Sequence, residues 1–156
     1  MCDEAHKYGI KVIVDVIANH TTPATDEVSE DLIEAGGGSL ETLYHKEGRT
    51  PLNDFGDRLA CTTYEMGGLP DINTERPSFQ KYFFNYINDC IACGADGFRY
   101  DTAKHIGLSD DPKEDDGFKN NFWEKATKEV DNAENLFIYG EVLQGDNDRL
   151  ADYIKE

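Results

Sequence analysis

Three apolar segments that alternate with helical segments restrict the fold of this 156-residue chain more than any other feature. The first, residues 11–18, is a nearly continuous run rich in β-branched side chains, which is typical of a parallel strand buried on both faces. Residues 95–103 and 136–143 form the other two. This alternation predicts an α/β fold with a parallel sheet and right-handed crossovers.

Two segments have the spacing of amphipathic helices. Apolar side chains recur every three or four positions from Pro77 to Gly94 and again in 118–130, which gives each segment one apolar face. Pro77 suits the first turn of a helix, and Gly94 suits the residue just past its end. Residues 1–9 resemble a helix end and 148–156 a helix start. The side chains predicted to face inward are Phe79, Phe83, Tyr86, Ile87, Cys90 and Ile91 in the first helix and Phe118, Phe122, Trp123, Ala126 and Val130 in the second.

Residues 21–75 separate the first strand from the first full helix. They hold many acidic residues, the glycine runs 36–38 and 67–68, and no long apolar period. A connection of this length usually marks a functional insertion. Short local elements are expected within it at 31–34 and 40–44.

Charge and composition exclude several classes of partner. The chain has 32 acidic and 15 basic residues and a formal net charge of −17, so it should repel nucleic acid and anionic membranes. No apolar run approaches the ~20 residues that a membrane helix needs. The four cysteines define no disulfide framework and no complete zinc site.

Polar side chains gather where each predicted strand ends. Asn19 and His20 follow the first strand, residues 99–105 surround the end of the second, and Glu141 stands at the end of the third. Ligand sites of parallel α/β folds lie at the carboxyl ends of the strands. Each of these residues alone is more often a cap, an ion-pair partner or a loop residue, whereas their ordered occurrence on successive strands favours a site.

Arg99 and Asp101 are two positions apart on one predicted strand, so they share a face. An arginine beside a carboxylate favours its ionised form, which a nucleophile on a sugar carbon requires. Asp101 and Glu141 end consecutive strands, and neighbouring strands lie ~4.8 Å apart. That separation is compatible with the ≈5–5.5 Å between the two carboxyl groups of retaining glycosidases.

Four short segments, in this order, resemble the motifs of one enzyme family. They read DVIANH at 15–20, LPDIN at 69–73, GFRYDTAKH at 97–105 and GEV at 140–142. The chain is thereby similar to the α-amylase family, glycoside hydrolase family 13. The resemblance implies part of a TIM (β/α)8 barrel, with strands three to five and an irregular domain B.

The resemblance implies domain limits and catalytic roles. Residues 1–20 and 76–156 would be barrel parts, and 21–75 a domain B-like insertion. Asp101 matches the nucleophile and Glu141 the general acid/base. Arg99 matches the residue that orients and charges the nucleophile, and Asp15 is expected to support the site through Arg99.

Substrate and metal ligands also follow from the resemblance. His20 matches a ligand of the reacting sugar, and Lys104 with His105 matches a pair on the leaving-group side. A calcium cofactor would take oxygen ligands from Asn19, Asp71, the carbonyl of His105 and a carbonyl near Thr62. Oxygen donors of this kind suit a hard cation, although Asn and Asp at such positions also commonly cap turns.

The expected function is that of a retaining α-amylase, which hydrolyses α-1,4-glucosidic bonds in starch-like glucans and maltooligosaccharides. An α-glucosidase or transglycosylase of the same family, or a module that binds glucan without turnover, remains an alternative. Such a barrel needs ≈250 residues, so we expect a piece of a longer enzyme that is inactive alone. The compartment stays open, although starch as a substrate would place the parent enzyme outside the cell.

Overall fold

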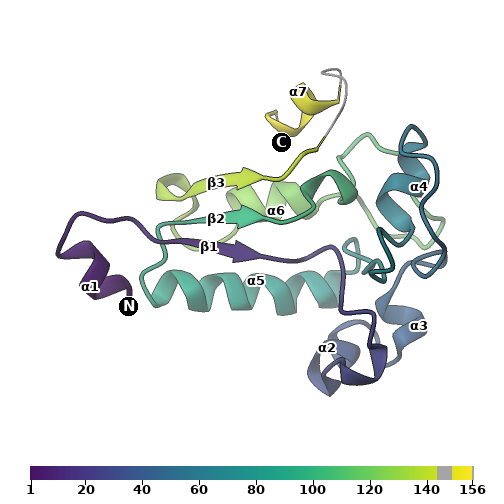
Figure 1. The fold of residues 1–156 in the computed structure, drawn as a ribbon, viewed down its shortest axis with the longest axis horizontal. Coiled ribbons are helices and arrows are strands. Elements are labelled where there is room, and N and C mark those ends of the chain that lie inside the picture. Colours follow the sequence, from purple (N-terminus) through teal and green to yellow (C-terminus); the bar gives the residue numbers. More distant parts are fainter. Residues whose placement is uncertain (144–148, 156) are drawn as a thin grey trace.

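The computed structural model describes residues 1–143 and 149–155, and within them a three-stranded parallel sheet in the order β1-β2-β3. The register aligns Val16 with Tyr100 and Tyr100 with Gly140. The predicted parallel α/β architecture is therefore confirmed, although each strand is shorter than predicted (Figure 1). The strands are β1 (Ile13–Val16), β2 (Gly97–Tyr100) and β3 (Phe137–Gly140).

Helix α5 (Pro77–Ala92) covers one face of the sheet, as its apolar period predicts (Figure 1). Phe79, Phe83 and Ile87 are buried in a core that also contains Phe98 of β2. The helix ends as expected at Gly94, whose φ of 94° only glycine adopts at little cost. The prediction was wrong for Tyr86, which is 45% exposed at the edge of the apolar face.

Helix α6 (Phe122–Lys128) packs behind β2 and β3 and begins four residues later than predicted. Phe118 precedes the helix and lies under the guanidinium of Arg76, 4.9 Å from ring centroid to Cζ. A hydrogen bond from Phe118 N to the Asp116 carboxylate holds this turn outside the helix. The buried side chains Phe122, Trp123 and Ala126 face inward as predicted.

The two faces of the sheet differ in what covers them. Val16, Phe98 and Tyr100 point toward the helices and are at most 2% exposed. On the opposite face, Ile13 is 37% and Phe137 62% exposed. The expectation that the first strand is buried on both faces is wrong, because no helix or strand among the described residues covers this second face.

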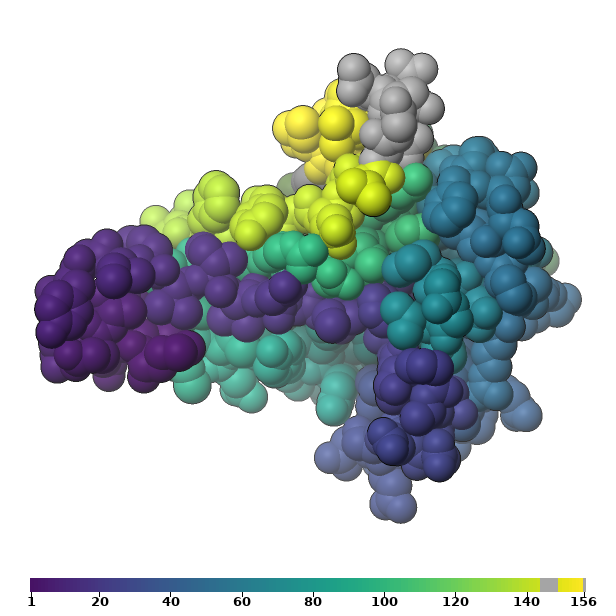
Figure 2. Space-filling model, viewed as in Figure 1, coloured from purple at the N-terminus to yellow at the C-terminus, as the bar shows by residue number. Residues whose placement is uncertain are grey.

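The insertion forms a lobe beyond the carboxyl ends of the strands, on the right in Figures 1 and 2. Both short elements expected there are present, but a further helix, α4, was not predicted. Ser29, Ser39 and Asp57 accept backbone N–H groups at the starts of the three helices. The elements are η1 (Thr25–Glu27), α2 (Glu30–Ala35), α3 (Leu40–Leu43) and α4 (Arg58–Thr63).

Short elements complete the described chain. They are α1 (Cys2–His6), η2 (Ala103–His105), η3 (Ala133–Asn135) and α7 (Leu150–Tyr153). The last matches the helix expected near the end, while Asp148 and Glu156 lie outside the described residues. The four cysteines are free. Within 1–143 and 149–155, no helix has the length and apolar character to cross a bilayer.

Candidate active site

Arg99 is the centre of a charge cluster on the open face of the sheet. Its Nη1 lies 2.7 and 2.8 Å from the two carboxylate oxygens of Asp15 and 3.0 Å from Asp101 Oδ1. Its Nη2 lies 3.1 Å from Glu141 Oε2. The hydrogen bonds that Arg99 donates to Asp15 and to Asp101 raise the pKa of Arg99 despite some desolvation. One guanidinium therefore joins three carboxylates from three neighbouring strands.

The backbone fixes where Asp101 and Glu141 stand. Asp101 N donates to Val16 O at 2.9 Å, and Glu141 N donates to Tyr100 O at 2.9 Å. Both residues therefore continue the sheet's hydrogen-bond ladder just beyond the assigned strands. Gly140 makes this possible, because a Cβ at that position would lie 2.5 Å from the Ala103 Cβ. Any side chain there would push Glu141 away from the end of β2.

Thr102, the residue after the predicted nucleophile, has a left-handed backbone with φ 49° and ψ 34°. For a β-branched residue this conformation is strained. Its backbone N donates to Glu141 Oε2 at 3.3 Å, and its hydroxyl donates to Asp101 O at 2.8 Å. The same hydroxyl lies 3.4 Å from Asn19 Oδ1. Sequence reasoning missed Thr102, because a threonine after an aspartate gives no sign of a positive φ.

His20 lies beside this cluster. Its Nδ1 is 3.3 Å from Asn19 Oδ1 and 3.4 Å from Thr102 Oγ1. Burial lowers the pKa of His20, and the charge of Asp101 only partly opposes this effect. At neutral pH the imidazole is therefore a neutral hydrogen-bonding group, which suits contact with a sugar hydroxyl.

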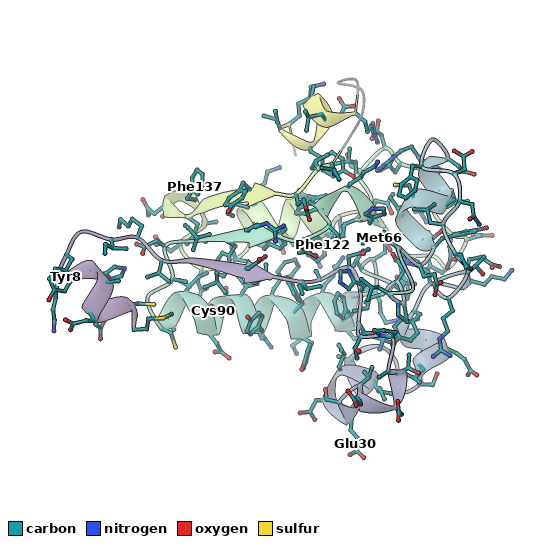
Figure 3. All side chains as sticks on the ribbon, in the orientation of Figure 1. Tyr8, Glu30, Met66, Cys90, Phe122 and Phe137 are labelled. Atoms are coloured by element: carbon teal, nitrogen blue, oxygen red, sulfur yellow. The ribbon has the colours of Figure 1, made fainter. Side chains whose placement is uncertain are left out.

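A cavity of about 350 Å³ adjoins Glu141. Lys104 is part of its lining, with Nζ donating to Leu143 O at 3.1 Å and lying 5.1 Å from the Phe55 ring centroid. Phe55 is 51% exposed and also packs edge-on against the ring of His105, at 6.1 Å. The residues that line the cavity are Phe55, Met66, Thr102, Lys104, His105, Glu141 and Leu143. Figure 3 labels Met66 near the carboxyl ends of the strands.

Sequence reasoning missed Phe55 and Met66. Both have acidic neighbours in the sequence of the insertion, and the aromatic Phe55 between Asp54 and Asp57 was the available signal. Their position beside Lys104 makes an amphipathic pocket with an aromatic wall. Such a wall suits the apolar face of a sugar ring.

Two segments that are distant from Lys104 in the sequence hold its backbone. Its carbonyl accepts from Tyr153 Oη at 2.8 Å and from Arg58 Nη1 at 3.3 Å. Arg58 in turn is paired with the buried Asp111, through contacts of 2.7 and 3.0 Å. The next residue, His105, donates from Nδ1 to the Cys61 carbonyl at 2.8 Å. Lys104 and His105 are thus held from α4 and α7 together.

Three of the four predicted calcium ligands meet at one point. The side-chain Nδ2 of Asn19 donates to Asp71 Oδ2 at 2.9 Å and to the His105 carbonyl at 3.1 Å. Thr62 does not join them through its side chain, because its hydroxyl donates to the Arg58 carbonyl within α4. The α4 carbonyl that contacts His105 is that of Cys61, one residue earlier.

This group differs from a site built from charged side chains. In the described part of the chain, no three His, Cys, Asp or Glu side chains gather so that they could hold a metal ion. The group at Asn19 has one carboxylate, one amide and one backbone carbonyl. It therefore fits a cation that prefers oxygen donors, such as calcium, better than zinc.

His45 lies behind Asp71 and was not singled out from the sequence. Its Nδ1 is 2.9 Å from Asp71 Oδ1, and its Nε2 is 2.7 Å from Glu75 Oε2. Burial opposes a charge on His45, but the hydrogen bonds to the two carboxylates outweigh it and raise the pKa. For Asp71, burial has the opposite effect and raises the pKa, and the hydrogen bonds that Asp71 accepts from His45 and Asn19 only partly lower it again.

Known proteins are similar to this chain in sequence and in structure. A family described as the catalytic domain of α-amylase matches residues 61–156. The chain belongs to this α-amylase family. Over 98% of its length it is 49% identical to an α-amylase of Butyrivibrio fibrisolvens and 36% identical to an α-amylase of Clostridium acetobutylicum. Its structure is similar to that of an α-amylase from Geobacillus thermoleovorans complexed with acarbose, with a TM-score of 0.72 and 28% identity over 99% of the chain.

Membership of the α-amylase family confirms the resemblance inferred from the four motifs. The chain spans 17% and 20% of the two curated relatives and 30% of the Geobacillus chain. Its three parallel strands, with their helices and insertion, correspond to part of the (β/α)8 barrel of the α-amylases. The predicted fold class, a partial barrel of α/β type, is therefore confirmed.

Proposed function

We propose that this chain carries the reacting groups of a retaining α-amylase that hydrolyses α-1,4-glucosidic bonds. The single observation that supports this most is the contact of one guanidinium, Arg99, with both Asp101 and Glu141 at the ends of adjacent strands. The arrangement brings two carboxyl groups into one small region. Retaining glycosidases use such a pair on the two sides of a glycosidic bond.

In the first step, Asp101 attacks the anomeric carbon and forms a glycosyl ester. The bond from that carbon to the leaving oxygen breaks, and Glu141 gives its proton to this oxygen. In the second step, Glu141 takes a proton from water, whose oxygen attacks the same carbon. Asp101 leaves as a carboxylate, and the product keeps its anomeric configuration.

The neighbouring residues support these steps. Arg99 contacts Asp101 and directs it toward the open face, and Asp15 holds Arg99 from the other side. His20, as a neutral donor, binds a hydroxyl of the reacting sugar. The cavity at Lys104 and the neighbouring His105 binds the leaving-group sugar, with Phe55 added to the predicted pair as its aromatic wall.

Calcium is part of the proposal. Asp71 Oδ2 and the His105 carbonyl both accept from Asn19 Nδ2, so two acceptor oxygens converge where positive charge is favourable. Asn19, Asp71 and the His105 carbonyl would hold the ion, with an α4 carbonyl near Thr62 as a further ligand. When bound, calcium would fasten the insertion, residues 21–75, to the barrel parts 1–20 and 76–156 that we propose flank it.

The test is reducing-sugar release from soluble starch with calcium present. It is run on this chain and on a chimera in which the chain replaces the matched segment of the Butyrivibrio α-amylase. We expect the chimera to hydrolyse starch and its Asp101→Asn form to be inactive. A folded chimera with no activity, or one that Asp101→Asn leaves unchanged, would contradict the proposal. Cyclic or elongated products from maltooligosaccharides would assign a transglycosylase instead.

A further inference from the structure

The buried group formed by His45, Asp71 and Glu75 has no part in the reaction described above. The side chains are 3%, 1% and 7% exposed, respectively. Each nitrogen of the imidazole faces a different carboxylate, at 2.9 Å for Asp71 and 2.7 Å for Glu75. The histidine is also tied through its backbone, because His45 N donates to the Asp71 carbonyl at 3.1 Å. Its imidazole is therefore fixed relative to Asp71 by two independent bonds.

The contacts of Asp71 divide its two oxygens between two tasks. Oδ1 accepts from His45, and Oδ2 accepts from Asn19, whose amide also reaches the His105 carbonyl. A carboxylate on a flexible side chain has no intrinsic reason to present one given oxygen. Here the hydrogen bond at Oδ1 removes that freedom, so Oδ2 is the oxygen left to face Asn19.

We propose that His45 is a positioning residue that orients Asp71 for calcium, and that its bond to Glu75 serves the fold rather than the metal. The inference rests on the proposed calcium site. Groups that hydrogen-bond a metal ligand from behind typically change metal affinity 10- to 100-fold when they are removed. His45 stands in this relation to Asp71, while Glu75 is one contact further from the ligands.

Two substitutions separate the nitrogens of His45. In His45→Asn the side-chain amide can stand near the former Nδ1 and keep the donor to Asp71. In His45→Gln it can stand near the former Nε2 and keep the donor to Glu75. Each variant loses one bond to a buried carboxylate, so a role confined to folding predicts similar effects of both. A role in positioning Asp71 predicts that only His45→Gln weakens calcium binding strongly.

The experiment is calorimetric titration of the metal-free chain with calcium chloride, together with unfolding midpoints without and with calcium. We expect a dissociation constant about 10- to 100-fold higher for His45→Gln than for wild type. We expect His45→Asn to stay within about 3-fold of wild type. The rise in the unfolding midpoint on adding calcium should shrink in the same order, because the stabilisation by a bound ligand grows with the logarithm of its concentration divided by its dissociation constant.

Equal calcium affinities of the two variants would overturn the role of His45. A third variant, Glu75→Gln, keeps His45 and Asp71 in place and should bind calcium like wild type even if the histidine variants unfold. If Glu75→Gln instead weakens calcium as much as His45→Gln, the positioning role is also wrong. Failure of wild-type protein to bind calcium would refute the metal site itself, and starch hydrolysis by the chimera would still test the proposed reaction separately.

Discussion

Two charge clusters in this chain have more carboxylates than cations, and they differ in their exposure to water. Arg99 contacts three carboxylates on the open face of the sheet, and the most exposed of them, Asp15, is 62% exposed. His45 contacts two carboxylates, Asp71 and Glu75, that are 1% and 7% exposed. Solvent screens the unbalanced charge of the first cluster, whereas burial makes each partner of the second depend on the others.

This difference in exposure predicts different roles for the two clusters, one in the reaction and one in the stability of the fold. The Arg99 cluster has room for a substrate, so changes there should alter rate more than stability. The His45 cluster is buried, so changes there should alter stability and the geometry of the residues that it contacts. Four substitutions, ordered by expected effect, test this division.

The largest effect is expected for Asp101→Asn. An amide cannot form the glycosyl ester, so starch hydrolysis by the chimera should fall by at least about 10³-fold. The unfolding midpoint in urea should stay near that of the parent. Asp26→Asn, at an exposed position of η1, is the matched control and should keep full activity. A large loss of stability in Asp101→Asn would contradict the claim that the Arg99 cluster affects rate more than stability.

The second effect is expected for His45→Ala. Removing one partner of a buried ion pair costs about 3–5 kcal/mol, because the remaining charges are left without compensation. Urea unfolding followed by circular dichroism measures this loss. His6→Ala, which breaks the more exposed pair with Asp96, is the control and should change the midpoint far less. A similar, small change in both variants would show that burial does not separate the clusters.

The third substitution, Asp15→Asn, tests how far the exposed Arg99 cluster depends on its outermost carboxylate. Asp15 gives Arg99 its shortest contact, so losing its charge should let the guanidinium move away from Asp101. Misplacement of about 1 Å can lower rates by about 100-fold, and we expect about 10-fold here in kcat of the chimera. Unchanged kcat would mean that Asp101 and Glu141 hold Arg99 sufficiently by themselves.

The smallest effect concerns a third, exposed cluster at the opposite ends of the strands. Lys11, the backbone N of Val12 and His6 all contact Asp96, and the hydrogen bond from Lys11 is the main reason that its pKa lies well below the usual 3.8. A lowered pKa in the folded state contributes stability above pH 3.8 that is lost as pH falls below it. Asp96→Asn should therefore lower the midpoint of thermal unfolding at pH 7, and the gap should narrow below pH 4. A gap that widens in acid would contradict this assignment.

The sequence predicted the parts of the fold that repeat regularly. The period of α5 and the order of the three strands could be predicted, because a buried face requires apolar side chains at regular positions in the sequence. The exposed Tyr86 and the late start of α6 were not, since each depends on a local contact, such as that of Phe118 with Arg76.

The candidate site divides in the same way. The contacts of Arg99 with Asp101 and Glu141 agree with the spacing on adjacent strands, while the roles themselves remain proposals. The cluster of His45 and Glu75 was not foreseen, because residues 30 positions apart in an irregular insertion have no period that would bring them together. Motifs indicate which residues react, whereas the residues that hold them are visible only in three dimensions.

Thr102 connects the carboxylate pair at the strand ends with the buried group at Asn19. Its backbone N–H contacts Glu141, its hydroxyl lies near Asn19, and it directly follows Asp101. A glycine would adopt its left-handed backbone without strain, but it would remove the hydroxyl that spans the two regions. The consequence is that the pair Asp101 and Glu141 is linked to the oxygen-rich group at Asn19 through one residue, so a disturbance of either should reach the other.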